Sequence, residues 1–228
     1  FLSYIIPKKI ISCSQRAIKV HKNMIYCKNK FVYIPNGIQD HYILNGKDST
    51  NKNPVIGFVA RMDSQKNHTN FFKSLKYIKH PTCFTLLGRG VENIELSEYG
   101  IGENISISLL GEVIDIFSIY DSLDFIILPS VYGEAFPNVL MEAMSRGVVC
   151  ISSDIGDSLS IMSSTGYRID DPYSPFSIAK AINCAVEDFK LSHSSYRYRS
   201  NSSILRIRSN YRLMDVITKY NKTWSLSS

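Results

Sequence analysis

Residues 125–151 read FIILPSVYGEAFPNVLMEAMSRGVVCI, and this stretch decides the fold. Residues 125–128 are uniformly apolar, which is typical of a strand buried on both faces of a parallel sheet. A turn containing Gly133 follows. The next segment ends at Gly147 and has apolar residues at helical spacing: Val139, Leu140, Ala143 and Met144. Residues 148–152 are again strand-like, so the stretch predicts a strand, a turn, a helix and a second strand.

The same alternation continues on both sides of this stretch. Further strands are predicted at residues 55–60, 83–87 and 105–111, and further helices at residues 69–78, 114–123 and 175–189. Helices between successive strands favour parallel strands joined by right-handed crossovers. We therefore predict an α/β fold built on a doubly wound, mostly parallel, Rossmann-like sheet.

A smaller unit precedes this sheet. Two short strands are predicted at residues 10–14 and 31–34, with a helix at residues 14–27 between them. In the turn that follows, Gly37 is expected to adopt a positive φ. The polar residues 45–53 are interpreted as a linker.

The composition excludes several classes of protein. No apolar run reaches the roughly 20 residues that a membrane-spanning helix requires. The five cysteines are widely spaced and form no Cys-x-x-Cys pair. We therefore expect reduced, mostly buried thiols in a cytosolic protein, without a zinc or disulfide framework. The chain has no initiator methionine and starts in a strand-like stretch at residues 1–6, so it is expected to be part of a longer protein.

Basic residues are concentrated at the two ends of the chain. Residues 1–39 contain seven Lys or Arg residues and no acidic residue, and residues 196–228 contain seven against the single acid Asp215. A solvated face is the simplest interpretation, and an anionic membrane surface is the next. Nucleic acid is not expected as a partner, because no helix-turn-helix, zinc-finger or aromatic RNA-binding pattern accompanies the charge.

Two carboxylates flank the predicted turn and helix. Glu134 lies in the turn, and Glu142 lies eight residues later inside the helix. The first N–H groups of a helix lack partners and attract anions. Because Pro137 has no N–H, those of Asn138 and Val139 are the natural phosphate donors. An anion site with a carboxylate on each side suits a ligand that has both phosphates and hydroxyls, such as a nucleotide-sugar.

Other polar groups follow the remaining predicted strands. Ligands bind at the carboxyl ends of strands in such sheets, where Arg61, Lys66, Gly88 and Gly111 fall in this chain. Arg61 and Lys66 alone would be interpreted as exposed loop charges, but beside an anion site they are candidates for a diphosphate. His68 is interpreted as a helix-start or surface residue rather than a catalytic base.

The order of these motifs resembles the carboxyl-terminal half of a family 4 retaining glycosyltransferase of the GT-B fold. The matching pieces lie, in order, at residues 34–38, 57–66, 86–90, 110–111, 128–130, 133–144 and 153–157. Two glutamates separated by seven residues, Glu134 and Glu142, are the most specific piece. Where several members have glycine, this chain has Ala135 and Pro137, a variation that resembles O-antigen and capsule transferases.

The resemblance implies a role for each candidate residue. Arg61 and Lys66 would hold the donor diphosphate, Glu142 the ribose hydroxyls, and Glu134 the transferred sugar near its reacting carbon. The other implied donor-binding residues are Gly88, Gly111, Gly133, Phe136, Asn138 and Val139. The family is usually independent of metals, so neither a metal nor another cofactor is expected. A glycan or lipid-linked acceptor and a cytoplasmic location, peripheral to the inner membrane face, are also implied.

The resemblance also divides the chain into three parts. Residues 1–45 would be the remnant of an amino-terminal acceptor domain with its linker, residues 46–195 the donor-binding domain, and residues 196–228 helices that cross back. Two alternatives stay open. The chain is either a non-catalytic nucleotide-sugar-binding module, since the acceptor domain is missing, or a sugar-nucleotide epimerase of the same architecture. The epimerase requires a different acid/base set, for which the sequence offers no convincing candidate.

Overall fold

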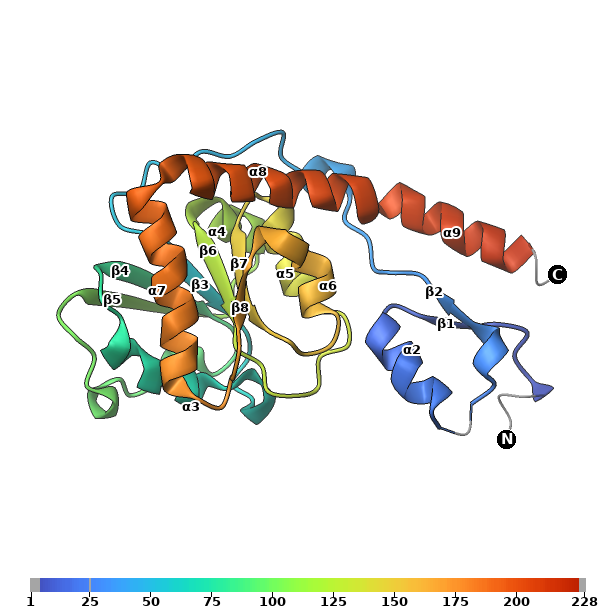
Figure 1. The fold of residues 1–228 in the computed structure, drawn as a ribbon, viewed down its shortest axis with the longest axis horizontal. Helices are drawn as coiled ribbons and strands as arrows, with labels where there is room; N and C mark the ends of the chain where they lie inside the picture. Colours follow the sequence, from blue (N-terminus) through green and yellow to red (C-terminus); the bar gives the residue numbers. More distant parts are fainter. Residues whose placement is uncertain (1–4, 25, 226–228) are drawn as a thin grey trace.

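The computed structural model describes residues 5–24 and 26–225, and it contains one large and one small parallel sheet. The large sheet has the strand order β5-β4-β3-β6-β7-β8, with every neighbouring pair parallel (Figure 1). Its strands are β3 (Val55–Val59), β4 (Thr82–Leu87), β5 (Ile105–Gly111), β6 (Phe125–Leu128), β7 (Val149–Ser153) and β8 (Tyr167–Ile169). The prediction of a doubly wound, Rossmann-like sheet is confirmed.

Helices cover both faces of the large sheet. They are α3 (His68–Ser74), α4 (Ile116–Ser122), α5 (Asn138–Ser145), α6 (Ser158–Met162) and α7 (Pro175–Leu191). Successive side chains of β6 point to opposite faces, as the pleat requires. Phe125 and Ile127 pack in the core beneath α3 and α7, whereas Ile126 and Leu128 pack in the core beneath α4, α5 and α6. Each of these buried side chains stabilises the fold by roughly 1.5–3 kcal/mol.

One helix beside the large sheet and one strand within it were not predicted. They are the five-residue helix α6 and the three-residue strand β8, which pairs with β7 at the sheet's edge. Both are too short to show a hydrophobic period. The predicted helix at residues 69–78 ends earlier, because α3 passes into a 3₁₀ turn at Leu75–Tyr77.

The small unit consists of β1 (Ile10–Ser12), α2 (Gln15–Lys22) and β2 (Phe31–Tyr33). The two strands are parallel, with Ile10 opposite Phe31. The helix was predicted at residues 14–27, but it begins one residue later, at Gln15, and already ends at Lys22. Ser14 is its N-cap, and the Ser14 side chain accepts a hydrogen bond from the N–H of Ala17 at 3.0 Å. Residues 1–4 of the predicted strand-like start lie outside the described residues.

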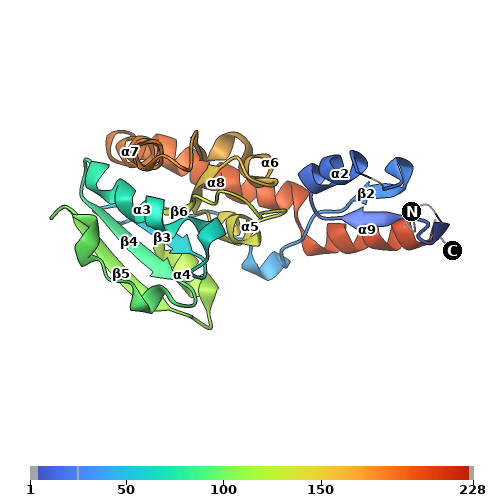
Figure 2. The same ribbon diagram turned by 90° about the horizontal axis from the view of Figure 1, so that it is seen from below.

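Two long helices join the units. Helix α8 (His193–Asn210) runs along the large sheet, and α9 (Leu213–Ser225) continues to the small unit (Figure 1). Figure 2 shows α2 and α9 on opposite sides of the β1–β2 pair. The predicted division of the chain into residues 1–45, 46–195 and 196–228 stays a prediction.

The prediction that Gly37 has a positive φ is wrong. Seven glycines have a positive φ, and Gly37 is not among them. Instead, Gly37 lies where the connection from β2 crosses the start of α9. A Cβ at this position would stand 2.8 Å from the Cα of Leu213. The close approach follows from a parallel bridge, in which the N–H of Leu213 donates to the carbonyl of Ile38 at 2.8 Å.

The cysteines form no disulfide within the described residues, and the prediction that they are mostly buried is wrong. Cys150 is buried and Cys184 is exposed, whereas Cys13, Cys27 and Cys83 are partly exposed. In the described parts of the chain, no helix combines the length and apolar character needed to cross a bilayer.

Candidate functional site

The predicted site residues gather where the strand order reverses. The chain proceeds from β3 outward to β4 and β5, then returns to β6 on the other side of β3. Such a switch point leaves a crevice at the carboxyl ends of the two central strands. Arg61 follows β3 there, and Gly133 and Glu134 follow β6.

The connections after β3 and β6 are bonded to each other. The N–H of Val131 donates to the carbonyl of Gln65 at 2.9 Å, and the hydroxyls of Ser64 and Tyr132 lie 2.6 Å apart. Gly133 has φ 79°, and a Cβ there would lie 2.5 Å from the Gln65 side-chain oxygen. Glycine is therefore required for both the conformation and the close packing that place Glu134.

The Glu134 carboxylate is held by two neighbours. Its Oε1 forms an ion pair with the Lys66 ammonium group and accepts a hydrogen bond from Ser130 Oγ at 2.9 Å. The side chains of Lys66 and Glu134 are only 15% and 10% exposed. Charge-assisted hydrogen bonds in such a poorly solvated site are stronger than those at the surface. Both contacts use Oε1, so they fix the orientation of the carboxylate.

A helix N-terminus adjoins this carboxylate. Helix α5 begins at Asn138, and Pro137 before it supplies no side-chain cap. No side chain of Pro137 caps the first N–H groups of α5, so an anion could bind there, and binding by the N–H groups of Asn138 and Val139 stays a prediction. The Asn36 amide donates to the Asn138 side chain at 2.7 Å, which brings the connection from β2 to the same place. Phe136 is buried against Tyr211, with their rings 5.8 Å apart.

Glu142 lies in the same helix and contacts α4. The Tyr120 hydroxyl donates to Glu142 Oε2 at 3.1 Å. Burial raises the pKa of the Glu142 carboxyl, and the bond from Tyr120 offsets part of this rise.

An open pocket of about 550 Å³ lies beside Arg61, over the ends of β3, β4 and β5. Its wall includes Ala60, Arg61, Gly88, Arg89, Glu112, Val113 and Ile116. Gly88 has φ 129°, and a Cβ there would approach the Ala60 carbonyl oxygen to 2.3 Å. Gly111, at the end of β5, also has a positive φ of 66°.

The two predicted phosphate-binding cations have different partners. The exposed Arg61 guanidinium pairs with Asp63 at 3.1 Å, whereas Lys66 pairs with Glu134. Arg61 therefore lines the pocket, whereas Lys66 contacts the Glu134 carboxylate.

His68 begins α3, as predicted, but it is not a surface residue. It is 3% exposed and stacks on Phe58, with 4.3 Å between the ring centres. Burial lowers the pKa of the imidazole to about 4.

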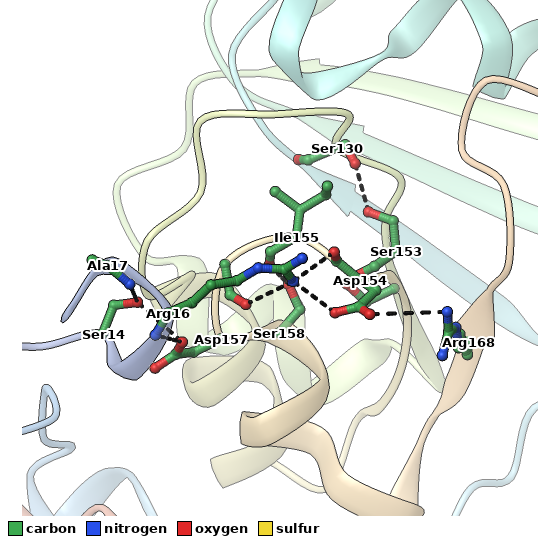
Figure 3. Close-up of polar contacts among 12 residues, drawn as sticks. Ser14, Arg16, Ala17, Ser130, Ser153, Asp154, Ile155, Asp157, Ser158 and Arg168 are labelled. Carbon is green, nitrogen blue, oxygen red and sulfur yellow. Dashed lines mark hydrogen bonds and ion pairs between the residues drawn. The ribbon is translucent and has the colours of Figure 1, made fainter. Parts of the chain in front are cut away.

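Sequence reasoning missed Asp157, which joins the small unit to the site. Its carboxylate accepts a hydrogen bond from the N–H of Arg16 at 3.0 Å (Figure 3). It also accepts one from the N–H of Gln15 at 2.7 Å and one from the Ser14 hydroxyl at 3.0 Å. Its own N–H donates to the carbonyl of Ala135 at 2.9 Å. The N-terminus of α2 is thus linked through one residue to the backbone beside Glu134.

An ion pair lies next to this link. The Arg16 guanidinium contacts the Asp154 carboxylate at 2.8 Å, and Arg168 approaches the other Asp154 oxygen at 3.9 Å (Figure 3). The Ser153 hydroxyl donates to the carbonyl of Ser130 at 2.5 Å, so the loop after β7 also supports the Glu134 loop. Ser130 and Tyr120 were missed as well: Ser130 falls within the matching piece at residues 128–130 but was not singled out, and Tyr120 lies outside every motif.

In the described residues, no group of three or more His, Cys, Asp or Glu side chains is arranged to hold a metal ion. The predicted independence of metals and cofactors stays a prediction.

Residues 53–188 match the family model described as Glycosyl transferases group 1, which is more than half of the chain. Among curated proteins, an N,N'-diacetylbacillosaminyl-diphospho-undecaprenol alpha-1,3-N-acetylgalactosaminyltransferase of Campylobacter jejuni is 29% identical over 103 residues. That match covers 45% of this chain and 27% of the relative.

Solved structures share the fold over nearly the whole chain. Anabaena HepE in complex with UDP-glucose matches with a TM-score of 0.81 at 17% identity, covering 98% of this chain and 65% of that one. A glycosyltransferase from Rickettsia africae matches with a TM-score of 0.79 at 18% identity, covering 95% and 62%. The chain thus spans less than two thirds of the length of these proteins.

Proposed function

The chain belongs to the group 1 glycosyl transferases, and from this premise we propose that it is the donor-binding half of a retaining, nucleotide-sugar-dependent transferase of family 4. The observation that carries the proposal is the Glu134 carboxylate, oriented by Lys66 and Ser130 beside the N-terminus of α5. Doubly wound sheets bind nucleotides at this switch point. The activity of the whole protein is part of the proposal, because the chain spans only part of its relatives.

The donor diphosphate would lie between the pocket and α5. The N–H groups of Asn138 and Val139 would bind one phosphate. Arg61 would release Asp63 and bind the other phosphate instead. Lys66 would add a positive charge between Glu134 and the leaving group. These groups would stabilise the negative charge that the diphosphate gains as it departs, which is a role that Mg²⁺ fills in other enzymes.

Glu134 would act on the sugar itself. When the bond between the anomeric carbon and the phosphate oxygen breaks, its electrons leave with the diphosphate, and positive charge develops on the ring. A fixed carboxylate lowers the energy of that state without having to reorganise. The acceptor hydroxyl then bonds to the same carbon and loses its proton to the leaving phosphate oxygen. Glu142 would accept hydrogen bonds from the ribose hydroxyls, away from the reacting carbon.

The acceptor and the location are proposed from the relatives. The Campylobacter jejuni relative is named as acting on an undecaprenol-linked sugar, which supports a glycan or lipid-linked acceptor. Such an acceptor suits a cytoplasmic protein that binds the inner membrane face at its periphery.

Calorimetry with UDP and GDP, and with their glucose and mannose esters, tests the site. Arg61→Ala and Glu142→Ala should each weaken binding about ten- to a hundredfold, because each removes hydrogen bonds to a charged group. Arg197→Ala removes a similarly exposed arginine of α8, which pairs with Asp48, and should leave the affinity unchanged. Failure of the unmodified chain to bind any of these compounds would refute the donor site.

Two further outcomes decide between the reaction classes. Transfer or hydrolysis of the bound sugar with a retained anomeric configuration supports the transferase and excludes the binding-only module. Interconversion of the sugar's stereocentres on the nucleotide would instead show an epimerase. Activity that persists with EDTA present would support independence of metals.

A further inference from the structure

Tyr120 carries a hydroxyl that its packing does not require. The side chain is fully buried among the apolar residues between α4 and α5. Phe117 packs edge-on against its ring, with the centres 5.9 Å apart. A phenylalanine would fill the same space. The hydroxyl therefore has another purpose, and the Glu142 carboxylate lies 3.1 Å from it.

The hydroxyl can act only as a donor to this carboxylate. Burial, followed by the negative charge of Glu142, raises the pKa of the phenol far above its ordinary value. The proton therefore stays on Tyr120, and Oε2 of Glu142 accepts a hydrogen bond from the hydroxyl. The bond uses Oε2 and leaves Oε1 of Glu142 for another partner.

Helix α4 connects this pair to the open pocket. Ile116 lines the pocket and precedes Tyr120 by four residues, so the two share one face of the helix. Glu142, more than one turn into α5, is half-buried and contacts that face of α4 through the Tyr120 hydroxyl. A ligand that extends from the pocket toward α5 would pass Glu142.

We propose that Tyr120 is a positioning residue, which holds the Glu142 carboxylate so that it accepts the paired hydroxyls of the donor's ribose. This inference rests on the proposed function, because it assumes that a nucleotide occupies the site. A glutamate has three rotatable side-chain bonds, and anchoring one oxygen removes most of its rotamers. The anchored carboxylate then meets two neighbouring hydroxyls without losing that freedom on binding.

The opposite view is that Tyr120 only satisfies a half-buried carboxylate. Both views predict a less stable fold when the hydroxyl is removed, so a measurement of stability does not distinguish them. They differ in whether the loss of binding affinity depends on the ligand having a ribose or a 2′-deoxyribose. A positioning role is specific to ribose hydroxyls, whereas a structural role weakens every ligand alike.

The test compares Tyr120→Phe with the unmodified chain by calorimetry, using UDP, GDP and their 2′-deoxy counterparts. The unmodified chain should prefer the ribonucleotide about tenfold or more, as expected for a hydrogen bond to a charged group. Tyr120→Phe should reduce that preference to roughly threefold or less, and binding of the 2′-deoxy compound should change little.

Tyr196→Phe is the matched control. Tyr196 is equally buried, and its hydroxyl contacts another buried carboxylate, Asp124, at 3.4 Å. That pair lies at the opposite end of β6, so the preference for ribose should be unchanged. In a Glu142→Gln background, Tyr120→Phe should have little further effect, because the two residues act as one unit.

The outcomes separate the two hypotheses. Binding of neither UDP nor GDP by the unmodified chain overturns both the proposed function and this inference. Binding with an unchanged ribose preference in Tyr120→Phe overturns only the inference. Equal weakening of ribo- and deoxyribonucleotides, or loss of the folded circular dichroism spectrum, would show a structural role and overturn it as well.

Discussion

At the scale of single residues, the buried imidazole of His68 makes stability depend on pH. Its pKa is lowered by burial to about 4, whereas an unfolded chain has about 6.5. Between these values the unfolded chain binds a proton that the folded protein excludes. The free energy of unfolding should therefore fall as the pH drops from 6.5 to 4, by about 3 kcal/mol in all from this group.

Urea unfolding at several pH values checks this prediction. His68→Phe keeps a ring on Phe58 and removes the titration, so it should lose about 3 kcal/mol less than the unmodified chain over the same range. Within the described part of the chain, neither nitrogen of His68 meets the geometric criteria for a hydrogen bond, and its one polar neighbour is the Ala60 backbone, which raises the pKa less than burial lowers it. As a control, His80→Gln replaces a partly exposed histidine and leaves His68 in place, so the contribution of His68 to the slope should remain. Equal slopes for His68→Phe and the unmodified chain would contradict the prediction.

At the scale of elements, Asp157 links the start of α2 to the loop that follows β7. It is 4% exposed and accepts three hydrogen bonds at the start of α2. Asp157→Ala should destabilise the small unit by about 2 kcal/mol, which is typical of a lost helix cap. Hydrogen exchange at the amides of Gln15 and Arg16 should accelerate more than tenfold, while amides of β6 keep their protection.

Asp170→Ala serves as the control for this prediction. Asp170 is an exposed acid whose partner, Arg168, also approaches the Asp154 loop. Its removal should not change exchange in α2, because surface ion pairs contribute little. Unchanged protection of Gln15 and Arg16 in Asp157→Ala would show that α2 does not depend on this cap.

Elements with a clear period could be predicted from the sequence, and contacts between distant residues could not. The strands β3 to β7 and helices α5 and α7 are long or uniformly apolar, so their patterns are unambiguous. Strand β8 has only three residues, and its pairing partner decides its structure. Gly133 and Glu134 were found because the motif is local. The hydrogen bond between Tyr120 and Glu142 joins residues 22 positions apart, and that between Gln15 and Asp157 joins residues 142 positions apart. A local sequence pattern cannot predict contacts over such separations.

At the scale of the whole molecule, basic and apolar groups coincide at the end formed by the small unit. Helix α9 exposes Met214, Ile217 and Trp224 beside Lys219 and Lys222. Helix α2 has three basic residues in its last turn and exposes Val20. Exposed aromatic and aliphatic groups beside lysines suit the interface of an anionic bilayer. We therefore predict that this end binds membranes peripherally.

Co-sedimentation with vesicles of phosphatidylcholine and phosphatidylglycerol measures this binding. It should increase with the phosphatidylglycerol fraction and weaken as salt is raised from 50 to 500 mM, because the attraction is screened. Lys219→Glu with Lys222→Glu should weaken it at least tenfold, since each lysine near the surface is worth about 1 kcal/mol. Lys73→Glu with Lys76→Glu makes the same change of charge on α3 and the 3₁₀ turn after it, away from α9, and should have a smaller effect. Equal losses for the two pairs would indicate a response to net charge alone, and binding that ignores salt and lipid charge would refute the membrane surface as a partner.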